Sequence, residues 1–350
     1  MAIADRSSLQ VRHLFSPEGT FLNTATYGLP PRAAFESLMT AADEWRHGRC
    51  GFDGWDRAVG ESRASFARLH GVEAERIAVG SQTSAFVGLI AASLPDGARV
   101  VCPREDFTSV LFPFLAQEHR GVRVDLVALD DLAEAISGST TMVAFSAVQS
   151  ADGRVADLDA IHAAARHHGA RTVMDATQAS GWLPIDAARW DAVITSGYKW
   201  LLNPRGTAFM AIGDELLADT HPHLAGWYAT QEPCASLYGG PLRLAAGAKR
   251  LDVSPAWLSW VGAAPALALF EEIGIAAIGA HDLALANALR EGLGMEPSNS
   301  AIVSLDLDAD ASGRLAADGV KSAGRDGRIR LAFHLYNDET DVERALTALT

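Results

Sequence analysis

Ser196-Gly197-Tyr198-Lys199-Trp200 is the stretch of this sequence that says most about the fold. It follows the apolar run 192–194, and Lys199 lies 24 residues (199 − 175) after Asp175, which ends a second apolar run, Val173-Met174. Short apolar runs rich in β-branched residues are typical of buried parallel strands. Side chains at the carboxyl ends of such strands point into a ligand crevice. The sequence therefore predicts that Lys199 and Asp175 face one site.

A lysine and an acid in such a crevice suit one cofactor, pyridoxal phosphate (PLP). The lysine amine can form a Schiff base, and the acid can keep the pyridinium nitrogen protonated, so that the ring withdraws electrons from the substrate's Cα. Apolar surroundings weaken a lysine's preference for its charged form, which favours Schiff-base formation. We therefore predict catalytic roles for Lys199 and Asp175. The alternatives are a solvated surface lysine and an aspartate that caps a helix.

The composition is that of a large globular protein. A chain of 350 residues can form two domains, or one large domain and a smaller one. Hydrophobic residues make up 49% and charged residues 21%, which is ordinary for this class. The net charge of −14 disfavours a nucleic-acid-binding surface. No apolar run approaches the roughly 18 residues of a membrane span, so we expect neither nucleic acid nor membrane as a partner.

Cysteines and histidines give further expectations. Cys50, Cys102 and Cys234 have no CxxC spacing, and so sparse a set argues for a reducing compartment and against a disulfide framework. The first residues contain no apolar h-region, so no signal peptide is expected. These features predict a cytoplasmic protein. His221 and His223 lack a third ligand, and we expect no metal site.

Strand and helix patterns alternate through most of the chain. Strands are expected at 76–80, 99–103, 122–127, 141–147, 171–175, 192–195 and 207–212, with helices between several of them. Repeated strand–helix units imply a parallel or mixed sheet with helices on both faces. After a Gly- and Pro-rich loop at 220–256, the expected elements are helices near 257–273 and 279–293, strands at 301–307 and 328–333, and a helix at 338–349. The prediction is an α/β fold comprising an N-terminal arm (1–20), a large domain (21–259) and a small C-terminal α+β domain (260–350).

A phosphate-binding segment is expected at Gly80-Ser81-Gln82-Thr83-Ser84, which follows a strand and opens a helix. Backbone N–H groups and hydroxyls there form an anion site at the positive end of the helix. Ser196 is a second candidate donor. A Ser- and Thr-rich helix start is also a common cap. Gln178 is close enough in sequence to Asp175 to reach the cofactor's phenolic oxygen, or alternatively to complete a capping box.

Several spaced motifs together resemble the class V aminotransferase family of fold-type-I PLP-dependent enzymes. This family includes cysteine desulfurases, kynureninase-like enzymes and isopenicillin N epimerase-like proteins. The matching motifs are Phe21-Leu22-Asn23-Thr24-Ala25, Asp175-Ala176-Thr177-Gln178, Ser196-Gly197-Tyr198-Lys199 and Arg330-Leu331-Ala332-Phe333-His334-Leu335-Tyr336-Asn337. The resemblance extends from Phe21 to Leu349. It implies a mostly parallel sheet flanked by helices, PLP as cofactor and an amino acid as substrate.

The resemblance implies roles at the cofactor. They are the Schiff-base lysine for Lys199, the pyridinium partner for Asp175, a phenolic-oxygen contact for Gln178, and phosphate ligands for Ser81, Gln82 and Ser196. Phe107 falls where many relatives place a ring-stacking histidine. A phenylalanine can stack but cannot transfer protons, and plain core packing is its alternative. Gln149 falls near a position beside the ring.

The resemblance also implies substrate and subunit contacts. Arg330 matches the arginine that binds the substrate's α-carboxylate, and a guanidinium fork suits that group. Arg328, two residues away on the same strand face, competes for this role. Asn23 and Trp227 are further substrate-binding candidates, although Trp227 could equally lie in a dimer interface. Ser254 matches a residue donated to the phosphate of the neighbouring subunit, which implies a homodimer with shared active sites.

One departure from the family narrows the expected reaction. Desulfurases need a cysteine on the loop before the carboxylate-binding strand, and here the loop 318–327 contains none. Cys234 lies in another segment, so persulfide formation is not expected. The chain is closer to the epimerase- and lyase-like branch. We expect a β-eliminating carbon–sulfur lyase that acts at Cα and Cβ of an amino acid through a Lys199 aldimine. An aminotransferase, an epimerase and a non-catalytic PLP-fold binding protein remain alternatives.

Overall fold

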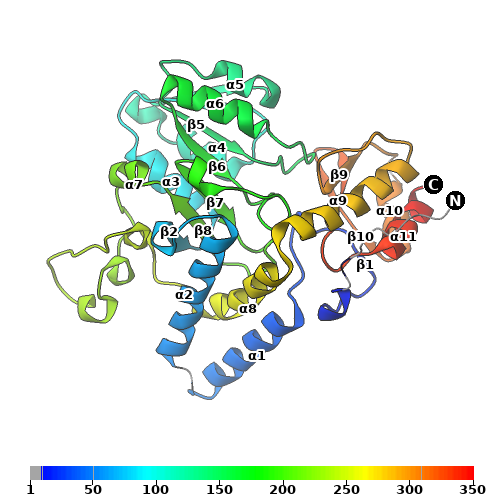
Figure 1. Ribbon diagram of the computed structural model, residues 1–350, viewed down its shortest axis with the longest axis horizontal. Coiled ribbons are helices and arrows are strands. Elements are labelled where there is room, and N and C mark those ends of the chain that lie inside the picture. The colour runs from blue at the N-terminus through cyan, green and yellow to red at the C-terminus, as the bar shows by residue number, and fades with distance from the viewer. Residues whose placement is uncertain (1–8, 10, 50, 309) are drawn as a thin grey trace.

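A seven-stranded sheet lies at the centre of the computed structural model, which describes residues 9, 11–49, 51–308 and 310–350 (Figure 1). Its order is β2-β8-β7-β6-β5-β3-β4. The bounds are β2 (Ile77–Gly80), β3 (Arg99–Pro103), β4 (Arg123–Val127), β5 (Met142–Ser146), β6 (Arg171–Asp175), β7 (Ala192–Ser196) and β8 (Ala208–Ile212). β8 is antiparallel to β2 and β7, and the other strand pairs are parallel. This mostly parallel sheet confirms the predicted α/β fold class.

Helices cover both faces of the sheet. Successive residues of a strand point to opposite faces, and in these strands both sets of residues are apolar. Phe145 and Met174 belong to the core under α2 (Phe52–Leu69), α5 (Leu132–Ala135), α6 (Leu158–His168) and α8 (Trp257–Ile273). Ala144 and Val173, one position away, belong to the core under α3 (Thr83–Ser93), α4 (Thr108–Leu115) and α7 (Asp214–Asp219). Burial on both faces holds the strands in register and fixes where their carboxyl ends lie.

The carboxyl ends of β2, β3, β5, β6 and β7 meet at one edge of this sheet, because only β8 runs in the opposite direction. β3 lies between β4 and β5, so the chain order reverses beside it. A ligand crevice forms at such a switch point, outside the carboxyl ends. The loops at this edge carry Ser81, Phe107, Gln149 and Lys199, and Asp175 ends β6.

A smaller C-terminal part is built on a three-stranded antiparallel sheet of β9 (Ile302–Leu305), β12 (Arg328–Ala332) and β11 (Ala323–Arg325) (Figure 1). Its helices are α9 (Ile275–Gly292), α10 (Ala311–Ala317) and α11 (Glu339–Leu349). β1 (Thr20–Phe21) pairs in parallel with β10 (Val320–Lys321), and Leu22 is buried in this core. The entry of the chain into the fold therefore lies in the C-terminal part.

The predicted boundary between the two domains at residue 260 stays a prediction, and the helix packing favours a later one. α8 packs against α1 (Arg32–Arg46) and α2, whereas α9 packs against α11 and β9. We propose that the boundary lies at Gly274, between α8 and α9. Residues 1–8 and 10 of the predicted arm, and Cys50, lie outside the described residues.

The sequence patterns gave no signal for α2, in which Gly54 and Gly60 lower helix propensity. The helix forms because Val59 and Phe66 are buried against the sheet. The remaining elements are short 3₁₀ turns at Arg12–Leu14, Ala74–Arg76, Glu118–Arg120, Leu129–Asp131, Ala187–Arg189, Trp227–Ala229, Pro233–Ser236 and Ala248–Leu251. Among the described residues, no single helix has the length and apolar content of a membrane span; α8 and α9 meet that test only jointly, as a pair bent by 85°.

Candidate active site

Lys199 follows β7 and lines a cavity at the carboxyl edge of the sheet. The residue is 6% exposed, and its amine has no hydrogen bond or ion pair with any other described residue. Nζ lies 5.4 Å from the ring centroid of Phe107 and 5.8 Å from that of Tyr198. Burial lowers the pKa of Lys199 to about 8, although the charge of Asp175 acts in the opposite direction. Lys199 is therefore buried, and its amine loses its proton more easily than that of a solvated surface lysine.

Asp175 ends β6 and lines the same cavity. β6 and β7 are adjacent and parallel, with Asp175 paired to Ile194, which brings the ends of both strands together. The Thr177 backbone N–H donates to Oδ1 of Asp175 over 2.8 Å. Burial raises the pKa of Asp175, while hydrogen bonds from Thr177 and the charge of Lys199 lower it. Turns rather than a helix follow the residue, so it caps no helix.

The expected phosphate segment forms one wall of the cavity. Ser81 and Gln82 are exposed there, immediately before α3 begins at Thr83. The Thr83 backbone N–H donates to Oγ of Ser196 over 3.1 Å, and the two side-chain hydroxyl oxygens are 2.9 Å apart. The Ser196 N–H donates to Oγ1 of Thr177 over 3.0 Å. Hydroxyls from α3, β7 and the turn after β6 thus meet at the positive end of a helix, an arrangement that suits a phosphate.

The other predicted cofactor contacts differ in their placement. Phe107 lines the cavity and is 45% exposed, which rules out plain core packing. Gln178 also lines it, but its amide already donates to the carbonyl of Ala25 (2.9 Å) and accepts from the indole of Trp200 (2.7 Å). Gln178 therefore holds loops together, and its contact with the phenolic oxygen stays a prediction. Gln149 is buried and does not line the cavity, and its Oε1 has no partner among the described residues.

Arg330 is buried beside the cavity. One guanidinium nitrogen, Nη1, donates to the backbone carbonyl and to Oγ (3.2 Å) of Ser150, which lines the cavity, and Nη2 donates to Oγ1 of Thr26 over 2.7 Å. Its Nε is buried without a partner among the described residues. Burial, together with the charge of Arg325, lowers the pKa of Arg330 to about 10. Arg328 is exposed at the start of β12, so the geometry favours Arg330 for carboxylate binding.

Three further predicted residues do not line the cavity of a single chain. Asn23 lies beside β12 in a bridge to Ala332, and its Oδ1 is buried without a partner among the described residues. Trp227, in the 220–256 region, packs against Phe52, with 5.9 Å between their ring centroids. Ser254 is exposed. Substrate contact by Asn23 and Trp227, and the role of Ser254 in a partner's site, remain predictions.

A buried histidine ties the Lys199 loop to the C-terminal part. Nδ1 of His334 lies 2.7 Å from Oδ2 of Asp282 in α9, and both side chains are fully buried. Nε2 of His334 lies 2.9 Å from the carbonyl oxygen of Trp200. Because a carbonyl oxygen only accepts, Nε2 carries a proton and donates it. The residue next to Lys199 is thus fixed from the other part of the molecule.

Other residues at the site were not singled out from the sequence. Tyr198 and Arg205 line the cavity, and the guanidinium carbon of Arg205 lies 4.5 Å from the Tyr198 ring centroid. Ser150 and Thr26 hold Arg330. Each of these four residues lies within or close to a motif or strand that the sequence predicted, and this proximity was the only sequence signal for them.

The cavity as a whole fits the predicted cofactor. Its volume is about 140 Å³, and the predicted residues that line it are Lys199, Asp175, Gln178, Ser196, Ser81, Gln82 and Phe107. It combines an unpaired amine, a buried carboxylate, an aromatic face and hydroxyl donors at a helix start. These are the groups that PLP requires.

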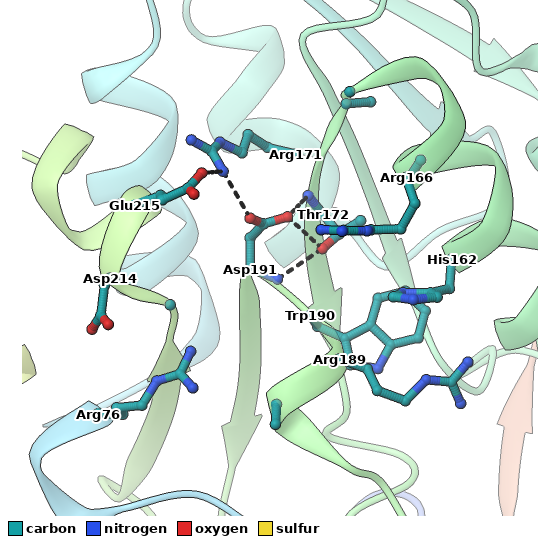
Figure 2. Close-up of a pocket in the computed structure, with 15 residues that line it drawn as sticks. Arg76, His162, Arg166, Arg171, Thr172, Arg189, Trp190, Asp191, Asp214 and Glu215 are labelled. Atoms are coloured by element: carbon teal, nitrogen blue, oxygen red, sulfur yellow. Dashed lines mark hydrogen bonds and ion pairs between the residues drawn. The ribbon is translucent and has the colours of Figure 1, made fainter.

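A larger cavity, of about 580 Å³, lies at the opposite edge of the sheet (Figure 2). Arg171, at the amino end of β6, donates to Asp191 (3.1 Å) and to Glu215 (2.6 Å) there. Asp191 also accepts from the N–H and hydroxyl of Thr172, each over 2.9 Å, as the dashed lines in Figure 2 show. The charged groups of Arg171, Asp191 and Glu215 are thus paired with one another, and the contacts of Asp191 join β6 to the start of β7. Size alone therefore does not identify the candidate active site, and the predicted site residues line the smaller cavity at the carboxyl edge.

In the part of the chain that the structure describes, thiols and groups of metal ligands are absent from the cavity. Of the described cysteines, Cys102 is buried in β3 and Cys234 is exposed in the 220–256 region, and neither lines it. Burial raises the pKa of Cys102, which keeps this thiol protonated. Within the described ranges, no three His, Cys, Asp or Glu side chains are grouped to hold a metal ion.

Comparison with known proteins agrees with this geometry. The chain is 28% identical to the uncharacterized aminotransferase YcbU of Bacillus subtilis (strain 168), over 83% of this chain and 84% of that protein. It is 29% identical to an isopenicillin N epimerase of Streptomyces clavuligerus, over 65% of this chain and 62% of that protein. Among solved structures, the cystine C–S lyase C-DES in complex with its product cysteine persulfide has a TM-score of 0.86 at 19% identity, over 95% of this chain and 97% of that one. This last likeness shows the fold.

Family membership rests on a match to most of the chain. The sequence model for the family described as Aminotransferase class-V matches residues 55–312. That segment contains Lys199, Asp175 and the start of α3. The chain therefore belongs to the class V aminotransferase family of fold-type-I PLP-dependent enzymes, as the motifs around Lys199 and Asp175 predicted.

Proposed function

We propose that this enzyme acts at Cα and Cβ of an amino acid and eliminates a β-substituent attached through sulfur. The observation that carries the proposal is the buried amine of Lys199, which has no partner among the described residues and lines one cavity with Asp175 and a helix start. Elimination is favoured over desulfuration because the loop 318–327 offers no cysteine to receive a sulfur atom.

Different residues around the cavity would hold different parts of the cofactor. Asp175 would hold the ring nitrogen, Phe107 would cover one ring face, and Ser81, Gln82 and Ser196 would bind the phosphate. Bound PLP supplies an electron sink for the negative charge that develops at the substrate's Cα. Burial of Asp175 and Lys199 strengthens their electrostatic interactions, because water screens them less.

Lys199 is the group that moves the proton. With its pKa lowered to about 8, a useful fraction of the amine is uncharged near neutral pH and can accept the proton from Cα. The amine makes no hydrogen bond to another described residue, so no such contact must break first. The fixed position of Trp200 against His334 limits how far the neighbouring lysine can drift.

Replacing Arg330 by alanine is expected to weaken substrate binding more than it slows chemistry. The variant loses the guanidinium that would bind the α-carboxylate, and a hydrogen bond to a charged group contributes about 1.5–3 kcal/mol. It also removes the donors to Ser150 and Thr26. The expected change is therefore a KM raised about tenfold or more, with a smaller change in kcat. Steady-state kinetics measure both constants, and an unchanged KM would remove Arg330 from substrate binding.

A direct assay separates the reaction types. The PLP-loaded protein is mixed with an S-substituted cysteine, the cofactor absorbance is followed, and pyruvate and thiol are measured. Pyruvate and thiol, with the starting spectrum restored, support the lyase. Conversion of the cofactor to its amine form without thiol release would indicate an aminotransferase. Racemised substrate would indicate an epimerase, and binding without any turnover would indicate a non-catalytic protein.

We also infer that the enzyme is a homodimer with shared sites. Large apolar side chains are exposed on α1 and in the 220–256 region, including Phe35 (52%), Met39 (52%) and Tyr238 (93%). Ser254 is exposed outside the cavity of its own chain, as a residue donated to a partner would be. Light scattering after size-exclusion chromatography is expected to give twice the 37.1 kDa chain mass, whereas a monomer that retains full activity would refute shared sites.

A further inference from the structure

The hairpin β11–β12 carries three arginines on one face, and one of them, Arg330, contacts Ser150 in the lining of the cavity. Arg325 and Arg328 are directly opposed across the two strands, and Arg330 follows Arg328 by two positions. Opposed residues and alternate residues share a face of a sheet, so all three guanidinium stems start on the same side. Arg330 is buried, whereas Arg325 and Arg328 are exposed.

Two of these arginines meet at one hydroxyl group. Oγ1 of Thr26 accepts from Nη2 of Arg330 over 2.7 Å and from Nη2 of Arg325 over 3.1 Å. Arg325 also donates from Nη1 to the carbonyl of Gly324 over 2.7 Å. Like charges side by side destabilise each other unless an anion lies between or beside them.

No acid in the described part of the chain forms an ion pair with Arg325 or Arg330. Asp326, the nearest acid in sequence, forms no hydrogen bond or ion pair with either guanidinium, and it lies at the turn of the hairpin with φ 47°. Their charges reach the catalytic amine, because both lower the pKa of Lys199. Neither charge is thus neutralised by an ion pair within the described part of the chain.

One anion is accounted for by the proposed function, namely the α-carboxylate at Arg330. Nε of Arg330 is buried without a partner among the described residues, and its other two nitrogens already donate to Ser150 and Thr26. Arg325 keeps further N–H groups free of partners in the described structure, since a guanidinium has five. It has the capacity for a second anionic group.

We propose that Arg325 binds a second carboxylate, at the end of the substrate's side chain, so that the enzyme selects amino acids with two carboxylates. The inference rests on the proposed function and makes its substrate class more specific. Arg330 takes the α-carboxylate in the buried position, and Arg325 takes the side-chain carboxylate at the mouth. Arg205, the other arginine at the cavity, lines it together with Ser81 and Gln82, and we assign it to the phosphate side.

The test compares acids with their neutral amides of nearly equal size. The probes are L-aspartate and L-asparagine, L-glutamate and L-glutamine, and S-carboxymethyl- and S-carbamoylmethyl-L-cysteine. Dissociation constants are measured on the PLP-loaded enzyme from the change in cofactor absorbance, independently of product formation. The variants are Arg325→Gln and, as matched control, Arg328→Gln, which removes the same charge from the same exposed hairpin face.

The expected result is that at least one acid binds about tenfold or more tightly than its amide, the strength of one charge-assisted contact. This preference falls to about one in Arg325→Gln and persists in Arg328→Gln. Equal binding of acid and amide in every pair would overturn the proposal. So would a preference that survives in Arg325→Gln, or one that both variants lose equally, since that would reflect diffuse charge.

Failure of the proposed function gives a different result. In that case the unaltered enzyme releases neither pyruvate nor thiol from S-carboxymethyl- or S-carbamoylmethyl-L-cysteine, whatever their dissociation constants. Binding of the neutral amides alone would keep the proposed function and overturn only the role of Arg325.

Discussion

Replacing Lys199 by alanine is expected to abolish turnover while leaving the fold intact. The side chain forms no hydrogen bond or ion pair with other described residues, so its removal costs little structure. It removes the amine that anchors the cofactor and accepts the Cα proton. Loss of a positioned proton acceptor alone slows a reaction about 10²–10⁴-fold, and loss of the covalent anchor adds to this. Pyruvate release from an S-substituted cysteine measures the effect.

Lys249→Ala is the matched control for this variant. Its amine lies 5.7 Å from the Tyr228 ring centroid, away from the cavity, and full activity is expected. Circular dichroism and the melting temperature of Lys199→Ala should stay close to those of the unaltered protein. A rate for Lys199→Ala within a few-fold of that of the Lys249→Ala control would contradict the proposed mechanism.

Replacing Asp175 by asparagine is expected to slow the reaction about 10²–10³-fold, the size of effect seen when one electrostatic contact to the developing charge is removed. Asparagine is nearly isosteric and can still accept the Thr177 N–H, so the loop geometry is kept. It carries no negative charge, and therefore cannot hold a ring nitrogen protonated. The cofactor should still bind, and kcat, measured together with the cofactor content, should fall.

A control for the loss of acidic charge comes from the opposite edge of the sheet. Asp191→Asn also neutralises an aspartate at a strand end, but its partners are Arg171 and Thr172 in the larger cavity (Figure 2). Its kcat should be unchanged, even if the protein melts at a lower temperature. If Asp175→Asn were as active as Asp191→Asn, Asp175 would have no part in the chemistry.

The sequence predicted the parts of the fold that depend on strong local patterns. The strands that end at Asp175 and Ser196 are continuous apolar runs, which only a sheet buried on both faces accommodates. Helix α2 was missed because its glycines weaken the local signal, and burial of Phe66 against the sheet outweighs them. The pairing of β1 with β10 joins residues 300 positions apart, and no local pattern carries such information.

The same contrast between local sequence patterns and tertiary packing applies to the candidate site. Lys199, Asp175 and Ser81 occupy strand ends or a helix start, so their meeting follows from the topology of a parallel sheet. The meeting of Arg325 with Arg330 at Thr26 depends on how the small sheet packs on the N-terminal segment. Likewise, the buried contact of His334 with Trp200 forms only in the folded chain. Positions of this kind are set by tertiary packing, which sequence periodicity does not encode.

The most direct test of the account is to find where the cofactor attaches. The PLP-loaded protein is reduced with borohydride and digested, and the pyridoxyl group is located by mass spectrometry. The chain has three lysines, Lys199, Lys249 and Lys321, so the assignment is unambiguous. The account predicts the group on the peptide that contains Lys199 and on no other. Stoichiometric modification of Lys249 or Lys321, or PLP-loaded protein with no modified lysine, would contradict it.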